Sequence, residues 1–173
     1  TKIGDDNSVS HELSIIRTHN GGDFSLRFYN LQNPDYVRVY VPENAELESI
    51  DGNDVPNFKP LVDYNNGQYK KDPDLDKLES NTSHPQDGVD VYNDSGRKVF
   101  GFWMILDPKQ TKTVTVKYKL ADAYKKGIYH LLIQKQAGTP GFPLTGRFTL
   151  PDDSTQDLNT DLSIDRELDI KIK

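Results

Sequence analysis

Apolar and polar residues alternate at every second position along much of this chain, and this alternation limits the folds open to it. In residues 111–120 the even positions from Val114 onward are apolar or aromatic, and the odd positions are Thr or Lys. Successive side chains of a strand point to opposite faces, so this period is typical of a strand with one buried face. Val, Ile, Thr and Tyr recur along the chain and Met occurs once, which favours strands over helices.

Two further segments carry a strong strand pattern. Residues 99–106 are apolar at nearly every position, so we expect a central strand that is covered on both faces. Between Leu162 and Ile172 the apolar residues keep to even positions, with Arg166 as the exception. That regularity predicts an amphipathic strand near the C-terminal end rather than a solvated acidic tail.

A hairpin is expected near the N-terminal end. Residues 13–18 and 24–28 both alternate, and Asn20-Gly21-Gly22 lies between them. Asn and Gly adopt the positive φ angles that tight hairpin turns need. The pattern therefore predicts that Phe24, Leu26 and Phe28 form one face of the second hairpin strand, which Asn33-Pro34 would end.

The spacing of these segments defines a fold class. About nine or ten short strands with turn residues between most of them predict an all-β chain, an antiparallel immunoglobulin-like β-sandwich. The chain has 173 residues, which is enough for one full hydrophobic core. We therefore expect a single domain over residues 1–173.

Residues 52–87 depart from this pattern. Apolar residues are sparse there, and Pro, Asn, Asp, Lys and Gly dominate. Loops this long are uncommon in compact domains and tend to be functional or mobile, so we expect a long polar insertion. Asp72-Pro73 resembles a helix N-cap followed by proline at the first helical position, which predicts a short helix over residues 73–79.

The charge balance excludes several classes of partner. The formal net charge is −6, and no run of Lys or Arg is longer than a pair such as Lys70-Lys71. Nucleic-acid binding and anionic membrane surfaces both call for a basic face, so neither is expected. No stretch approaches the roughly 18 apolar residues of a membrane span. We expect a domain that is not itself membrane-inserted, cut from a longer protein because the chain begins at Thr1.

Part of the sequence is similar to known bacterial surface proteins. The strands YVRVYVPE at 36–43 and KVFGFWMILDPKQTKTVTVKYKL at 98–120 are similar to many immunoglobulin-like surface modules. Together with YHLLIQKQAG at 129–138 and Asp165-Arg166-Glu167, they resemble the C-terminal β-rich region of a bacterial family described as domain of unknown function 4012. The resemblance spans roughly residues 36–173. It implies an extracellular setting on a membrane-anchored parent protein, and it supplies no catalytic residues.

The residues offer little for catalysis, and we expect a protein that is not an enzyme. The four histidines are His11, His19, His84 and His130, and none accompanies a Gly-x-Ser-x-Gly motif. There is no cysteine, which removes disulfides, thiol catalysis and thiolate metal sites. Glycoside hydrolysis needs two carboxylates placed across a cleft. Among 27 acidic residues such pairs arise by chance, so a carboxylate-based hydrolase accessory domain is only a second alternative.

Calcium is the metal that the insertion would favour, because hard cations take clustered carboxylates. The candidate ligands are Asp72, Asp74, Asp76 and Glu79. They do not make an EF-hand, because Lys77 stands where glycine is required and Ser83 where the bidentate glutamate belongs. A solvated acidic loop is the simpler interpretation, so no cofactor is expected and bound calcium is an open alternative.

Two groups of tyrosines are candidate ligand-binding residues, since glycans stack on exposed aromatic faces beside hydrogen-bonding groups. One group is the alternating face of Tyr36, Arg38 and Tyr40. The other is Tyr64 and Tyr69 within the insertion, among Asn65, Asn66 and Gln68. Ordinary packing of a tyrosine ladder on a sheet accounts for the same pattern and is the alternative interpretation.

The leading hypothesis is a non-catalytic extracellular module of a bacterial cell-surface protein, acting in adhesion, envelope interaction or spacing. Its partner would be a protein or a glycan at the cell surface. The alternative is a carbohydrate-binding module, with or without calcium. Surface sandwiches without cysteine sometimes carry a Lys–Asn or Lys–Asp isopeptide bond, for which Lys112, Lys117 and Lys119 are candidates. An intact mass equal to the sequence mass would exclude that bond.

Overall fold

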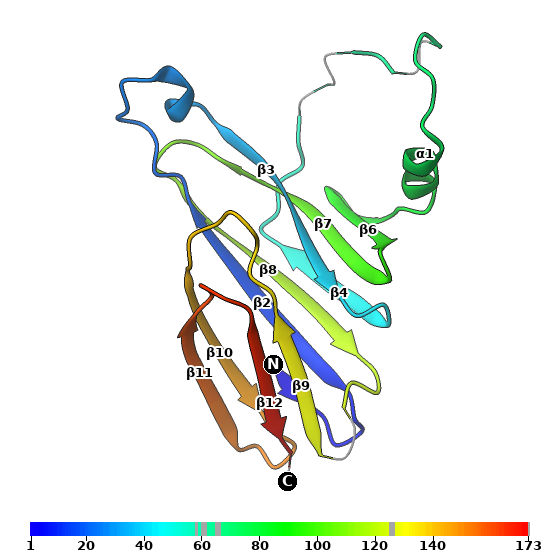
Figure 1. The fold of residues 1–173 in the computed structure, drawn as a ribbon, viewed down its shortest axis with the longest axis vertical. Coiled ribbons are helices and arrows are strands. Elements are labelled where there is room, and N and C mark those ends of the chain that lie inside the picture. The colour runs from blue at the N-terminus through cyan, green and yellow to red at the C-terminus, as the bar shows by residue number, and fades with distance from the viewer. Residues whose placement is uncertain (58, 60–61, 65–66, 125–126, 173) are drawn as a thin grey trace. The chain divides into compact units, whose positions relative to one another are not determined.

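The computed structural model describes residues 1–57, 59, 62–64, 67–124 and 127–172, and within them the chain is all-β apart from one α-helix and one 3-10 helix (Figure 1). The strands are β1 (Lys2–Ile3), β2 (Val9–Thr18), β3 (Asn33–Val41), β4 (Ala45–Asp51), β5 (Ser83–Gln86), β6 (Val89–Asp94), β7 (Arg97–Leu106), β8 (Thr111–Leu120), β9 (Ile128–Ile133), β10 (Pro143–Thr149), β11 (Thr155–Asp161) and β12 (Arg166–Lys171). The helices are the 3-10 helix η1 (Arg27–Asn30) and α1 (Pro73–Ser80).

The chain divides into two compact units. The terminal unit comprises Thr1–Glu12 and Lys117–Lys173, and the central unit comprises Leu13–Val116. Strands β2 and β8 each contribute residues to both units. The expectation of a single domain over residues 1–173 stays a prediction.

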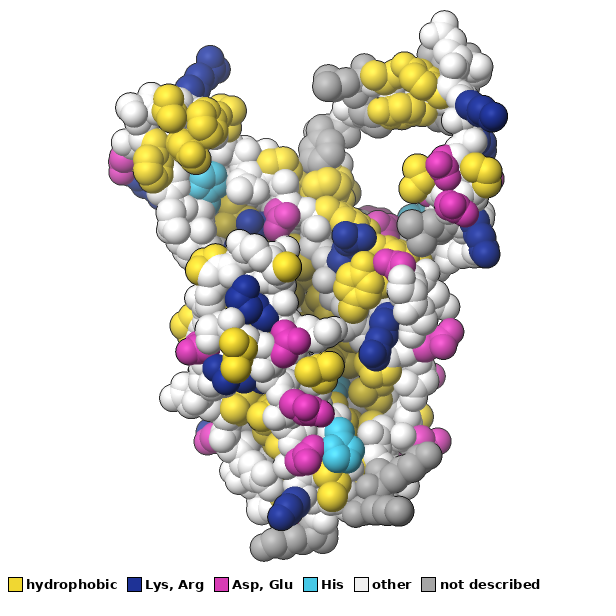
Figure 2. Space-filling model, viewed as in Figure 1, with side chains coloured by type: hydrophobic (Ala, Val, Ile, Leu, Met, Phe, Trp, Pro, Cys, Tyr) yellow, Lys and Arg dark blue, Asp and Glu magenta, His cyan; other side chains and the backbone are white. Residues whose placement is uncertain are grey.

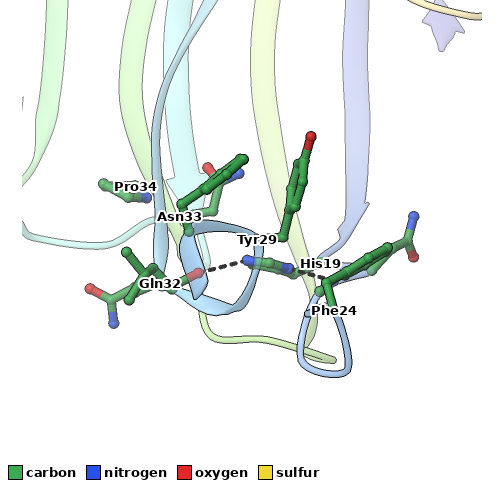
Figure 3. Close-up of a pocket in the computed structure, with 10 residues that line it drawn as sticks. His19, Phe24, Tyr29, Gln32, Asn33 and Pro34 are labelled. Carbon is green, nitrogen blue, oxygen red and sulfur yellow. Dashed lines mark hydrogen bonds between the residues drawn. The ribbon is translucent and has the colours of Figure 1, made fainter. Parts of the chain in front are cut away.

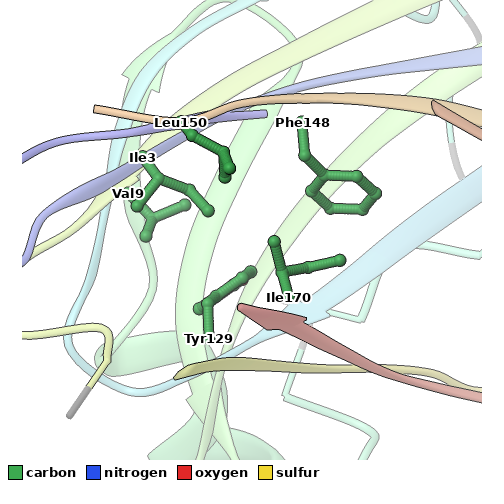
Figure 4. Packing of buried hydrophobic residues seen from close by; sticks show 6 residues of the cluster. All are labelled: Ile3, Val9, Tyr129, Phe148, Leu150 and Ile170. Atoms are coloured by element: carbon green, nitrogen blue, oxygen red, sulfur yellow. The ribbon is translucent and has the colours of Figure 1, made fainter. Parts of the chain in front are cut away.

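The terminal unit contains the strand order β11-β10-β1-β2 and a separate antiparallel pair, β9 with β12. Within this unit β1 pairs antiparallel with β2 and parallel with β10. The first sheet contributes Ile3, Val9 and Phe148 to an apolar cluster, and the β9–β12 pair contributes Tyr129 and Ile170 (Figure 4). Side chains from two sheets therefore meet in one core, as the inward-facing half of the alternation requires.

The central unit contains the strand order β2-β8-β4 and a four-stranded antiparallel sheet, β3-β7-β6-β5. Strand β7 lies between β3 and β6, so the prediction of a central strand over residues 99–106 is confirmed. Phe100, Phe102 and Met104 are completely buried. Val99 is buried as well, so consecutive positions of β7 are covered on both faces, whereas Trp103 and Ile105, on the face of Val99, are half-buried.

The hairpin expected at residues 13–28 is wrong. Strand β2 does form, but its neighbours are β1 and β8, and Phe24, Leu26 and Phe28 lie in no strand. The chain instead runs through a loop that includes η1 and enters β3 directly at Asn33-Pro34. Proline is tolerated there because β3 is an edge strand of its sheet. The backbone groups on one side of an edge strand form no hydrogen bonds with a neighbouring strand.

Two further predictions concern a short helix in the insertion and an amphipathic strand near the C-terminal end. Helix α1 begins at Pro73, and the Asp72 carboxylate accepts hydrogen bonds from the backbone N–H groups of Asp74 and Leu75. Near the C-terminal end, β12 (Arg166–Lys171) realises the amphipathic strand, with Ile170 buried. The alternation does not form one continuous strand, because Ile164 lies exposed between β11 and β12.

Candidate functional site

Residues 19–32, which connect β2 to β3, form what we call the tip loop. Five large apolar side chains of this loop are about half exposed or more: Phe24 at 53%, Leu26 at 54%, Phe28 at 62%, Tyr29 at 50% and Leu31 at 49%. Figure 2 shows apolar side chains gathered over this end of the central unit. Scattered exposed apolar residues are ordinary, but a gathered set marks a surface that contacts something.

The amide of Asn30 holds the tip loop in shape. Its Oδ1 accepts hydrogen bonds from the backbone N–H groups of Gly22, at 2.8 Å, and Phe24, at 3.1 Å. Its Nδ2 donates to the carbonyl oxygen of Phe24 at 2.6 Å. One side chain therefore supplies the backbone partners that a second hairpin strand would otherwise have supplied.

His19 closes the base of the loop. Its Nδ1 accepts the Gly21 N–H at 2.9 Å, so Nε2 carries the proton and donates to the Leu31 carbonyl oxygen at 2.9 Å. The His19 backbone is bonded in turn to the 107–110 turn, through the N–H of Lys109 and the carbonyl oxygen of Gln110. Gly21 is required because a methyl group at that position would collide with the Tyr29 carbonyl oxygen and the His19 ring.

The aromatic rings of the loop surround an open cavity of about 450 Å³. The Phe28 and Tyr29 rings lie 4.2 Å apart between centroids, and those of Phe24 and Tyr29 lie 5.3 Å apart. In Figure 3 the His19 ring lies at the centre, with Phe24 and Tyr29 to one side and Gln32 to the other. The cavity thus combines aromatic faces with an imidazole and an amide, and apolar walls with a few polar groups are typical of ligand-binding sites.

Two ion pairs lie at the tip loop and the strands that enter and leave it. Asp23 binds Lys109 with an O–N distance of 2.7 Å, and Arg17 binds Asp35 at 2.7 Å. Arg27 is exposed within η1, beside the apolar side chains. This end of the central unit therefore presents a nearly neutral apolar surface in a chain whose formal net charge is −6.

The predicted candidates Tyr36, Arg38 and Tyr40 do share the outer face of β3, but their polar atoms have partners. The Tyr36 hydroxyl donates to Asp90 at 2.5 Å, and the Tyr40 hydroxyl donates to Asp94 at 2.9 Å. Burial and the nearby carboxylate raise the pKa of Tyr36, in that order of size. The Arg38 guanidinium lies 5.9 Å from the centre of the Tyr40 ring. Hydrogen bonds to carboxylates therefore hold the two tyrosines in a row of aromatic side chains, a ladder that cross-strand packing favours.

Trp103 completes this ladder, and sequence analysis did not select it. Its ring lies 5.1 Å from that of Tyr36, because the two residues are paired across β3 and β7. The ladder also needs Gly101, where an added methyl group would meet the Tyr36 ring. The central-strand pattern assigned Trp103 to the core, so the register of β3 against β7 is what locates it on the outer face.

The structure brings Tyr64 and Tyr69 together within the insertion. Their ring centroids lie 5.2 Å apart, and the side chains are 64% and 47% exposed. The neighbouring residues Asn65 and Asn66 lie outside the described residues. The pair presents accessible aromatic faces, which is what stacking on a ligand requires.

The acidic cluster of the insertion is engaged in local structure. Asp72 caps α1, and the Asp76 carboxylate binds the Lys71 ammonium at 2.9 Å. Asp74 and Asp76 lie in the first turn of α1, where negative charge favours the helix dipole. Glu79 lies in its last turn. No group of three or more His, Cys, Asp or Glu residues in the described part of the chain is placed to hold a metal ion.

The other three histidines are bonded to residues outside the tip loop. His11 is buried in the terminal unit, bonded to the Tyr129 hydroxyl at 2.8 Å and stacked on Tyr118 with centroids 4.7 Å apart. His84 binds Asp90 at 2.8 Å, and His130 binds Asp169 at 2.5 Å. His11 is thus a packed core residue, and His84 and His130 are paired with carboxylates at the surface.

The three lysines considered for an isopeptide bond differ in their surroundings. Lys112 lies 2.5 Å from both carboxylate oxygens of Asp54, which also accepts the Ile105 N–H at 2.6 Å. The Lys117 ammonium lies 3.7 Å from Glu12. If a bond forms, Lys112 and Asp54 are the pair that the geometry favours, and a mass one water lower than the sequence mass would reveal it.

The tip loop is the feature that sequence reasoning missed. Its residues FSLRFYNL at 24–31 were assigned to a strand because three apolar residues alternate. The sequence did contain a signal for this loop. Large apolar residues are dense between two turn sequences, and no second alternating strand needed them as a partner. Comparison with known proteins adds no assignment, since no family model, curated protein or solved structure matches this chain.

Proposed function

We propose that this chain is a non-catalytic extracellular module of a bacterial cell-surface protein that binds its partner through the tip loop. The fold would be an immunoglobulin-like sandwich that supplies a rigid base, and the parent protein would be membrane-anchored, as in the family described as domain of unknown function 4012. Adhesion or envelope interaction suits an exposed binding tip better than spacing does, because a spacer gains nothing from one.

The exposure of five large apolar side chains on a pinned loop carries this proposal. Leaving such groups in water lowers solubility and favours aggregation unless a partner covers them. The loop does not collapse over them, because Asn30 and His19 hold its backbone in place. A preformed apolar surface loses little conformational entropy on binding, which favours affinity.

The experiment that tests this proposal measures retention of the fluorescently labelled chain on intact bacterial cells and on host cells. We expect the double variant Phe24→Ser with Phe28→Ser to lose retention. Ile164→Ser is the matched control, because Ile164 is 62% exposed, like Phe28, and lies in the terminal unit. Equal retention of the double variant and the wild-type chain would contradict the proposal.

A carbohydrate-binding module is the second candidate, favoured by the cavity between Phe24, Tyr29, His19 and Gln32. The exposed Tyr64–Tyr69 pair is a second place where a sugar ring could stack. A ligand that binds only the folded state raises its melting temperature, with a free energy of about 2.7 kcal/mol at a hundredfold excess over Kd. A rise with a soluble polysaccharide, lost in Tyr64→Ala or Tyr29→Ala, would favour this candidate and locate the site.

The same measurement covers calcium. Helix capping by Asp72 and the Lys71–Asp76 ion pair occupy part of the acidic cluster, so a calcium ion would have to displace local contacts. A higher melting temperature in calcium than in EDTA, lost in Asp74→Asn, would establish a calcium-supported module.

A further inference from the structure

We propose that the tip loop docks this protein on a lipid bilayer, with Phe24, Leu26 and Phe28 entering the interface between headgroups and acyl chains. This inference rests on the proposed function, since it names the ligand of the same loop. In the described part of the chain no helix has the length and apolarity that a membrane crossing needs. What is proposed is shallow insertion of one loop.

The size of the apolar surface favours a bilayer over a folded protein partner. The five exposed side chains fall within residues 24–31, whereas a standard protein interface uses roughly 20–30 residues on each side. A second copy of this chain would face the same shortage of area. Interfacial binding to lipid depends on how much apolar area enters the membrane, and a few large side chains on a protruding loop can supply it.

The hydrogen bonds of the loop match the demands of a membrane interface. Backbone N–H and C=O groups that leave water need internal partners. Asn30 satisfies Gly22 and Phe24, and His19 satisfies Gly21 and Leu31. The loop therefore presents apolar side chains while several of its backbone groups are already paired by its own side chains.

The remaining side chains suit the headgroup region. Tyr29 combines an apolar ring with a hydroxyl group, the combination that is enriched where membrane meets water. Arg27 lies between Leu26 and Phe28 in sequence and is exposed, so its alkyl part can follow the apolar surface while its guanidinium reaches a lipid phosphate.

The charge of the protein specifies which lipids fit. Asp23 and Asp35 are neutralised by Lys109 and Arg17, so the tip itself is not repelled by a membrane. The whole chain carries a net charge of −6, which opposes approach to anionic lipid. We expect binding to zwitterionic bilayers that changes little with salt, in contrast to a polybasic membrane site.

The test is flotation of the full chain with vesicles of pure phosphatidylcholine. We expect the wild-type chain and Ile164→Ser to float with the vesicles. Each phenylalanine that enters the bilayer contributes to the binding free energy. The double variant Phe24→Ser with Phe28→Ser should therefore bind the vesicles roughly a hundredfold more weakly than the wild-type chain. Vesicles containing phosphatidylglycerol should bind no better than pure phosphatidylcholine.

The absence of cysteine allows a direct depth measurement. A polarity-sensitive fluorophore on Ser25→Cys, in the exposed part of the tip loop, should brighten when phosphatidylcholine vesicles are added. The same fluorophore on Asp5→Cys, exposed in the terminal unit, should not change.

Three results would overturn the inference. The wild-type chain could stay unbound to phosphatidylcholine, it could bind only anionic vesicles, or it could form a dimer in solution that the double variant abolishes. If cell retention still depends on Phe24 and Phe28 in those cases, the proposed function stands with a protein or glycan partner. If neither cells nor vesicles are bound through the tip loop, both proposals fail.

Discussion

The tip loop and strand β7 carry similar sequence patterns and opposite environments. Phe24, Leu26 and Phe28 alternate as Phe100, Phe102 and Met104 do, yet the first three are more than half exposed and the last three are completely buried. Strand β7 has hydrogen-bonded neighbours on both sides, whereas in the tip loop the side chains of Asn30 and His19 pair several backbone groups. Alternation thus predicts that apolar side chains are buried only where the segment has neighbouring strands and becomes part of a sheet.

The largest effect should follow a change that empties a position in β7. Phe102→Ala removes a fully buried ring, and truncation of a buried phenylalanine costs about 3–5 kcal/mol in the free energy of unfolding. Urea denaturation of the variant and the wild-type chain measures the difference. A loss below about 1 kcal/mol would mean that β7 is not the centre of a packed core.

The contrast between buried and exposed side chains extends to the histidines and predicts a pH dependence. Burial, followed by the nearby N-terminal charge, lowers the pKa of His11 from its usual 6.5 to about 4. The unfolded chain therefore binds more protons between those values, so folding stability is full above pH 6.5 and falls as the pH drops towards 4. The maximum loss is about 3 kcal/mol.

Denaturation at several pH values between 7 and 4 tests this expectation. The variant His11→Phe should flatten the part of the curve that His11 controls. The control is His130→Gln, because the His130 side chain is 69% exposed and its pairing with Asp169 is at the surface. A curve for His11→Phe that matches the wild-type curve in shape would exclude His11 as the source.

A smaller loss is expected when the tip loop is forced out of shape. Gly21→Ala places a methyl group against the Tyr29 carbonyl oxygen and the His19 ring, and such overpacking typically costs about 1–3 kcal/mol. Hydrogen exchange should show faster exchange of the Gly22 and Phe24 amides, because Asn30 no longer meets them. Ser25→Ala is the control, and unchanged exchange in Gly21→Ala would show that the loop adapts without losing these bonds.

These contrasts explain how far sequence reasoning reaches. The strands β7 and β8 were predictable because a continuous apolar run in β7 and alternation in β8 are local patterns, and the residues that carry them are largely buried. The tip loop was not, because its shape depends on the side-chain chemistry of Asn30 and His19 rather than on period. The alternation predicted that Tyr36 and Tyr40 share one face of a strand. It could not predict the carboxylates that accept hydrogen bonds from their hydroxyl groups, because each lies 54 residues away in the chain. Only the register of the sheet brings them together.

The smallest effect on stability should come from the tip loop side chain that is most exposed. Phe28 is 62% exposed, so Phe28→Ser removes little buried area and should change the free energy of unfolding by no more than about 0.5 kcal/mol. The same change should raise solubility, measured as the protein concentration at which ammonium sulfate precipitates the chain. A destabilisation as large as that of Phe102→Ala would mean that Phe28 packs as a core residue, and the tip loop would then be a second core rather than a binding surface.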